Sequence, residues 1–283
     1  MILGEIANAI IKEKAKFVAF SGDLVLGGKT DAEVESQLQT WLGVMKPVYN
    51  SGLKVYAVRG NHETYCQHPN DVWQKTFVGK YAMPSNGPAG EKGMTYSVAY
   101  KNALIVGFDQ FQTDKARINQ PWLDGVLKKN QKQHLFLMAH EMAFRAGKHT
   151  DNMDNDVPAR DAFWSSIAKA GGRTYFSGHD HLYDRTAISA PGWPSNKAIQ
   201  QYILGTAGAP FYHSNDHDGA NSTWIQSPIK HIEDEFGYAV VDVDGPKVTI
   251  TFKTRKAPGV FVAADTWSYI APIHVAPKKK TSR

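Results

Sequence analysis

Residues 173–181 read RTYFSGHDH, a short apolar strand that runs directly into a polar turn. The stretch 161–170 before it has apolar residues at helical spacing and is predicted to be a helix. The same order of helix, apolar strand and polar turn occurs over residues 2–23 and again over residues 33–63. This alternation indicates an α/β fold.

Five predicted strands each end in a polar turn. We predict helices at 2–15, 33–49, 122–129 and 161–170, and these strands at 16–20, 54–58, 104–108, 134–139 and 173–176. In open α/β sheets, ligands bind beyond the carboxyl ends of the strands. The pattern therefore predicts one active-site edge that gathers Asp23, Asn61, His62, His140, His179 and His181.

The second half of the chain is richer in predicted strands. These lie at 201–204, 238–243 and 247–253, with a turn at 244–246, and they suit a second sheet packed on the first. No linker is long enough to separate domains. We therefore predict a single domain over 1–283, made of a motif-bearing half (1–185), a β-rich half (186–275) and a basic tail (276–283).

Composition excludes several classes of protein. Hydrophobic residues make up 42% and charged residues 21% of the 283, which is ordinary globular usage and argues against disorder or a coiled coil. The net charge is +5, and +2 remains without Lys278, Lys279 and Lys280, which is too little to predict nucleic-acid binding. Cys66 is the only cysteine, so an intrachain disulfide and a thiolate metal cluster are excluded. No apolar run is long enough for a transmembrane helix, and we predict no membrane contact.

Four short blocks carry the chemistry. They are Gly22-Asp23, Gly60-Asn61-His62-Glu63, His140 alone, and Gly178-His179-Asp180-His181. In three of them a glycine precedes a possible metal ligand, where a residue without Cβ lets the backbone turn sharply. One block by itself is more often a turn or a core histidine, but the four in this order resemble the calcineurin-like metallophosphoesterases. The resemblance covers about 17–185 and implies a four-layer αββα sandwich of two mixed β-sheets flanked by helices.

The resemblance also implies the role of each residue. Asp23 would bridge two metals, Asn61, His140 and His179 would complete one metal site, and His181 would belong to the other. Imidazole nitrogens with carboxylate and amide oxygens suit divalent Mn, Fe, Zn, Ni or Co. Two such cations would activate a metal-bound hydroxide for attack on a phosphate ester. His62 would be the main catalytic residue that is not a ligand, donating to the phosphate or the leaving oxygen.

Residues 178–185 look similar to the GHxHxYER block of purple acid phosphatases. In that subgroup a tyrosine follows the GD motif and binds ferric iron, whereas this chain has Leu26, so the purple colour should be absent. His149 falls in a loop where the subgroup places histidines that face the substrate, and the alternative is a solvated loop histidine. His213, His217 and Asp218 lie in the polar loop 212–221, for which we expect a solvated surface position rather than the mouth of the cleft.

The first metal motif of the family, D-x-H or D-x-G, has no counterpart in this sequence. The 22 residues before Asp23 contain neither histidine nor aspartate. We therefore expect the fold to lack its first core strand. We also expect the sequence to start inside a longer protein, because losing a central strand exposes edges and apolar surface. The family binds two metals; if Met1 is the true start, one of the two sites keeps only Asp23 and His181, and catalysis should then be weak or absent, with as few as one metal bound.

The expected function is metal-dependent hydrolysis of a small phosphorylated substrate, either a monoester or a diester. The alternative is a catalytically impaired or non-catalytic metal-binding scaffold of the same fold, which the missing motif suggests and the presence of His62 opposes. Nuclease activity has little support, since basic residues do not cluster beside the four blocks. We expect a periplasmic or secreted location by resemblance to exported relatives, and the sequence does not predict the oligomeric state.

Overall fold

A computed structural model describes residues 1–112, 117–217 and 223–271. Its helices are α1 (Ile2–Lys12), α2 (Asp31–Asn50), α3 (Pro69–Thr76), α4 (Gln120–Lys129) and α5 (Val157–Lys169). Its strands are β1 (Phe17–Phe20), β2 (Lys54–Ala57), β3 (Tyr96–Tyr100), β4 (Ala103–Gly107), β5 (His134–Met138), β6 (Thr174–Ser177), β7 (Tyr183–Ser189), β8 (Ile199–Leu204), β9 (Ile225–Ile232), β10 (Gly237–Asp244), β11 (Lys247–Ala257) and β12 (Val260–Ile270).

A seven-stranded mixed sheet forms the middle of the molecule, in the order β3-β4-β5-β6-β8-β7-β9. Strands β4, β5, β6 and β8 are parallel, so the chain leaves β5 and β6 at the same edge. Every residue of β5 is buried because both faces of the sheet are covered. Leu135 and Leu137 pack in the core beside α4 and α5, and Phe136 packs on the other face against β10–β12.

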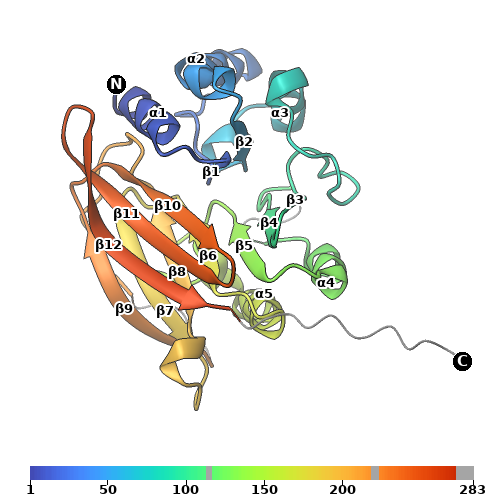
Figure 1. The fold of residues 1–283 in the computed structure, drawn as a ribbon. Coiled ribbons are helices and arrows are strands. Elements are labelled where there is room, and N and C mark those ends of the chain that lie inside the picture. The colour runs from blue at the N-terminus through green and yellow to red at the C-terminus, as the bar shows by residue number, and fades with distance from the viewer. Residues whose placement is uncertain (113–116, 218–222, 272–283) are drawn as a thin grey trace, which may run out of the picture.

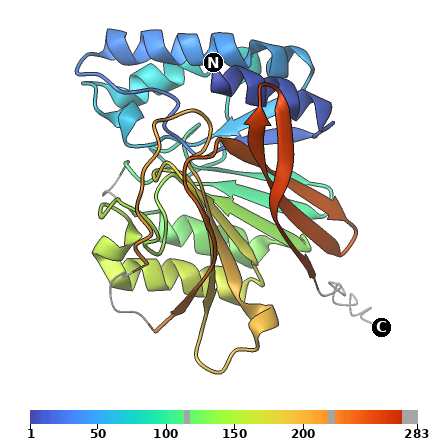
Figure 2. The ribbon, with the colours of Figure 1, turned by 90° about the vertical axis from the view of Figure 1, so that its left-hand side faces the viewer.

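The second β layer is made of β10–β12 and of the parallel pair β1–β2, with α1 and α2 outside the pair (Figures 1 and 2). The predicted order of helices, sheet, sheet and helices is confirmed. This layer is not one continuous sheet. β1 pairs with β2, and β10 pairs with β11, but within the described residues no ladder joins these two pieces. Ion pairs of Glu5 in α1 with Arg255, and of Glu13 just after α1 with Lys253, attach the α1 region to β11.

The predicted helices and strands all occur, with ends that shift by a few residues. Strands β3, β7, β9 and β12 were not predicted. The edge strand β9 contains Pro228, which lies opposite Thr186 where the register of the ladder shifts. Such a strand has neither the alternation nor the apolar content that identifies a strand in sequence. The predicted basic tail 276–283 lies outside the described residues.

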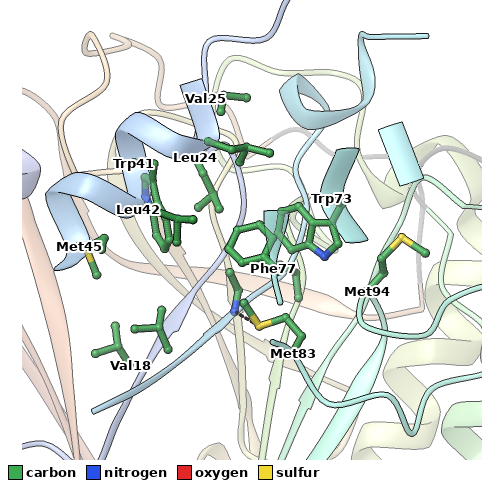
Figure 3. Close-up of a cluster of buried hydrophobic side chains, with 14 of the residues drawn as sticks. Val18, Leu24, Val25, Trp41, Leu42, Met45, Trp73, Phe77, Met83 and Met94 are labelled. Atoms are coloured by element: carbon green, nitrogen blue, oxygen red, sulfur yellow. Dashed lines mark hydrogen bonds between the residues drawn. The ribbon is translucent and has the colours of Figure 1, made fainter. Parts of the chain in front are cut away.

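Buried side chains hold the loop after β1 in place. Leu24 and Val25 follow Asp23 directly and are buried in a core cluster with Trp41 of α2 and with Trp73 and Phe77 of the α3 region (Figure 3). The free energy of burying these two side chains, about 1.5–3 kcal/mol each, opposes any movement of the loop. Within the described residues, no helix combines the length and the apolar character that crossing a membrane requires.

Candidate metal centre

Four predicted ligand atoms meet where β1, β2, β5 and β6 end. The His140 Nε2 atom lies 3.2 Å from Asp23 Oδ2, 3.1 Å from Asn61 Oδ1 and 3.1 Å from His179 Nδ1. His140 and His179 are buried, and Asp23 is mostly so. One nitrogen facing three electron-rich atoms at this distance is the arrangement expected around a cation, since two lone-pair atoms otherwise repel each other.

Backbone conformation at this edge is unusual at the ligands themselves. Asp23 has φ of 53° and His179 has φ of 67°, in the left-handed region that side chains with Cβ seldom adopt. Gly22 has φ of 89°, and a Cβ there would lie 2.7 Å from Gly60 N and from His140 Nδ1. The backbone is therefore strained where it aims the two ligands, a feature that clusters at functional sites.

The orientation of His140 is set by a second hydrogen bond. Its Nδ1 lies 2.8 Å from the carbonyl oxygen of Ser21, which makes Nδ1 the N–H donor and leaves the Nε2 lone pair for a metal. Burial alone would lower the pKa of His140, but the Asp23 carboxylate reverses this effect and raises it to about 9. Without a cation, a proton on His140 balances Asp23; a divalent cation would take the place of that proton.

Asn61 and His62 are positioned by neighbours that the sequence did not reveal. The Asn61 amide nitrogen donates to the Tyr65 hydroxyl at 2.5 Å, which turns Oδ1 toward His140. His62 Nδ1 donates to the Leu26 carbonyl at 2.7 Å, and His62 Nε2 lies 3.9 Å from Asp23 Oδ2. The His62 side chain is 33% exposed, so it borders the centre and faces solvent.

His181 lies at the other side of the centre and outside the close group of ligand atoms. Its Nδ1 donates to the carbonyl of Pro210 at 2.6 Å, and its ring stacks on Tyr212 with centroids 4.1 Å apart. The Nε2 lone pair is therefore the one available to a metal. Burial is the largest influence on His181 and lowers its pKa, which favours the neutral form that binds metals.

Glu63 is the main structural residue that sequence reasoning missed. Its buried carboxylate accepts three backbone hydrogen bonds, from Asp23 N at 3.0 Å, Leu24 N at 2.6 Å and Gly60 N at 2.5 Å. It therefore ties the loop after β1 to the loop after β2. Burial and the charge of Asp23 raise the pKa of Glu63 to about 7. Its place directly after Asn61-His62 was the one available signal.

The predicted His149 lies against the centre. Its ring stacks on His179 with centroids 3.9 Å apart, and its Nδ1 lies 2.9 Å from the buried carboxylate of Asp180. The Nε2 atom of His179 faces Asp151 Oδ1 at 3.2 Å. Asp180 and Asp151 were not predicted to have roles, because the contact of Asp180 with His149 and that of Asp151 with His179 form only in the folded chain.

The remaining loop histidines differ from each other. His213 is 64% exposed and pairs with Asp234, as expected for a solvated loop. The same expectation is wrong for His217, whose side chain is 13% exposed and lies 3.0 Å from the fully buried Asp184. The sequence could not show this difference, because Asp184 is brought to the loop by strand pairing. Asp218 lies outside the described residues.

The two-layered sheet arrangement and the candidate metal ligands Asp, Asn and His are those of an α/β protein of the metallophosphoesterase type. The family model described as calcineurin-like phosphoesterase matches residues 2–183, and the chain belongs to this family. The family is metal-dependent, and the donor atoms found here are of the kind that divalent transition metals bind. Among proteins with curated functions, none matches the sequence significantly.

Solved structures share the fold at low sequence identity. The purple acid phosphatase PPD1 from yellow lupin (Lupinus luteus) has a TM-score of 0.66 at 15% identity, and the match covers 94% of this chain and 48% of that one. PhoD has a TM-score of 0.67 at 11% identity, with coverage of 95% and 67%. GAP50, described as the anchor in the inner membrane complex of Plasmodium, has a TM-score of 0.64 at 13% identity, with coverage of 96% and 85%. The chain thus spans about half of the lupin phosphatase.

Proposed function

We propose that this protein hydrolyses small phosphate esters with divalent transition metals held by Asp23, Asn61, His140, His179 and His181. The observation that carries the proposal is the meeting of Asp23 Oδ2, Asn61 Oδ1 and His179 Nδ1 around His140 Nε2 at 3.1–3.2 Å. Bound there, a divalent cation would polarise a phosphoryl oxygen and lower the pKa of a water molecule.

His62 is the proposed proton donor. Its Nδ1 is held by the Leu26 carbonyl, so the ring presents Nε2 to the space beside Asp23. An imidazole at that place can donate to a phosphoryl oxygen or to the departing ester oxygen. Because it is partly exposed, substrate can reach it without a rearrangement of the core.

His149 is the proposed contact to the rest of the substrate. Three bonds to the single oxygen Asp180 Oδ1 hold it, from Lys148 N, His149 N and His149 Nδ1. The imidazole is 25% exposed and stacked on His179, which places it at the rim rather than in the core. A fixed rim group of this kind selects among esters more than it changes metal binding.

Separate variants test the ligand and donor roles. We expect His179→Ala to lose metal and activity together, and His62→Ala to keep its metal while kcat falls by about 10²–10⁴-fold. Metal content is measured per chain after reconstitution and desalting, and rates are measured with an aryl phosphate monoester and a diester. His68→Ala is the matched control, because His68 is 67% exposed and pairs only with Asp31 in this region. Metal retained in His179→Ala would contradict the ligand assignment.

A second candidate is a protein that binds metal but does not turn over phosphate esters. In the described residues Asp23 is the carboxylate grouped with both His140 and His179, while Asp151 is grouped with His179 and His149 instead, so one carboxylate would have to serve both cations. Full metal loading without hydrolysis of either ester would favour this candidate. Hydrolysis that disappears in His62→Ala would exclude it.

A further inference from the structure

A second cluster of metal-binding side chains lies outside the centre described above. Asp184 of β7 and His231 of β9 are directly opposite each other in the antiparallel ladder, and His217 reaches them from the loop after β8. His217 Nε2 and His231 Nδ1 both lie 3.0 Å from the same oxygen, Asp184 Oδ2. Asp184 is fully buried, and the two imidazole side chains are each 13% exposed.

The other hydrogen bond of the Asp184 carboxylate is made by its Oδ1 atom, so the Oδ2 atom faces the two imidazole rings. Thr186 donates its hydroxyl to the other oxygen, Asp184 Oδ1, at 2.7 Å. His231 Nε2 faces Glu233 Oε1 at 3.3 Å. In the described part of the chain, the ion pairs of Asp184 and Glu233 are with these imidazoles and not with a lysine or arginine.

His231 faces carboxylate oxygens with both ring nitrogens. Two states satisfy this contact: an imidazolium that donates to both carboxylates, or a neutral imidazole that binds a metal at Nδ1 and donates Nε2–H to Glu233. The metal-bound state also engages His217 Nε2, which lies 3.0 Å from the same Asp184 oxygen. A ligating imidazole whose other nitrogen donates to a carboxylate is the usual arrangement at zinc sites.

We propose that Asp184, His217 and His231 bind a zinc ion that is separate from the phosphoesterase centre. Zinc is bound by imidazole and carboxylate at about 2.0–2.2 Å, so ligand atoms on a tetrahedron lie about 3.3 Å apart. The spacing of 3.0 Å between Asp184 Oδ2 and each ring nitrogen is a few tenths of an ångström below this value, and the ligand atoms of the three side chains all lie within 4.8 Å of one another. Three protein ligands leave the fourth position for water.

Zinc at this place would fix the loop that carries His217. The same loop provides the Pro210 carbonyl that accepts from His181 and the Tyr212 ring that stacks on it. A second link, the ion pair of Arg145 with Asp216 at 2.7 Å, holds the loop next to His217. The zinc site would thus help to position His181. This positioning role depends on the proposed function of His181, whereas the proposal that zinc binds does not depend on it.

Zinc stoichiometry of the 283-residue chain tests the proposal. The wild type, His217→Ala, His231→Ala and the control His213→Ala are loaded with zinc, desalted and analysed for zinc per chain. His213 is a good control because it belongs to the same loop but is exposed and bonded to Asp234. We expect the first two variants to bind one zinc fewer than the wild type, and His213→Ala to match the wild type.

His140→Ala distinguishes this site from the phosphoesterase centre. It should lose zinc at the centre and keep one zinc that a further His217→Ala change removes. If the proposed function fails and no ester is hydrolysed, this pattern is unaffected. Equal zinc content in wild type, His217→Ala and His231→Ala would overturn the proposal and leave a hydrogen-bonded triad.

A crystallographic measurement covers the case in which the variants fold poorly. Wild-type crystals grown with zinc should give an anomalous peak about 2.0–2.2 Å from Asp184 Oδ2, His217 Nε2 and His231 Nδ1. Absence of a peak there, with zinc visible at the phosphoesterase centre, would overturn the proposal. His217→Gln, which keeps a polar side chain of similar length, should lose the peak while the fold persists.

Discussion

Replacing Glu63 tests whether one buried carboxylate holds together the two loops that carry Asp23 and Asn61. Glu63 is 2% exposed and accepts from the backbone N–H groups of Asp23, Leu24 and Gly60. Glu63→Ala removes the acceptor of all three bonds. Because Asp23 is in the left-handed conformation with φ of 53°, the lost bonds include one that keeps a strained ligand in place.

The size of the effect follows from the number of groups left unsatisfied. Each buried donor without an acceptor costs about 1–3 kcal/mol, and three donors lose their acceptor here. Water that enters the vacated space offsets part of this total. We expect Glu63→Ala to lower the free energy of unfolding by at least about 3 kcal/mol, a large fraction of the usual 5–15 kcal/mol. Glu63→Gln keeps one acceptor oxygen and should lose about 1–3 kcal/mol.

The free energy of unfolding of both variants is measured by urea denaturation, and the comparison is valid where their m-values equal that of the wild type. Glu35→Ala is the matched control, because Glu35 lies on exposed α2 surface and pairs with Lys75, so it should change stability by less than about 1 kcal/mol. The expected order of stability is wild type, then Glu63→Gln, then Glu63→Ala. A Glu63→Ala protein within about 1 kcal/mol of the wild type would refute the reasoning, since three buried donors would then have cost almost nothing.

Gly22→Ala should destabilise the protein more than Gly52→Ala, because both glycines have φ near 90° but only at Gly22 would the new Cβ meet other atoms, at 2.7 Å. Both variants have the left-handed strain of about 1 kcal/mol, so the difference between their unfolding free energies measures the clash alone. Equal losses of stability in the two variants would show that no clash occurs. Burial alone would raise the pKa of Asp265, but hydrogen bonds from Arg185 and Tyr183 lower it. Its contribution to stability is therefore present above the unfolded value of about 3.9 and is lost as pH falls through the folded pKa. The stability gap between wild type and Asp265→Asn should then shrink from pH 6 to pH 3, whereas a constant gap would contradict the pKa shift. Removal of bound metal with a chelator should lower the melting temperature, since a ligand at 100 times its Kd stabilises by about 2.7 kcal/mol; an unchanged melting temperature would mean that no tight site exists.

The meeting of several candidate ligand residues could be predicted in part because the signal is local. An apolar run of four or five residues followed by a glycine and a polar residue indicates where a strand ends and which polar side chain follows it. Parallel strands bring their carboxyl ends to one edge, so Asp23 could be expected to lie near Asn61, and His140 near His179. The packing of the two sheets then decides that the two pairs face each other. The order of the strands, β6 beside β8 rather than β7, was beyond the sequence.

Only the tertiary structure decided the contacts between segments that are distant in the chain. Glu63 reaches backbone groups 40 residues away, and Asp184 meets His217 and His231 across 33 and 47 residues. His213 and His217 look alike in the sequence, yet one is solvated and the other faces a buried carboxylate. A residue's own sequence neighbourhood sets its backbone preference, whereas strand pairing and core packing decide which buried partner it meets.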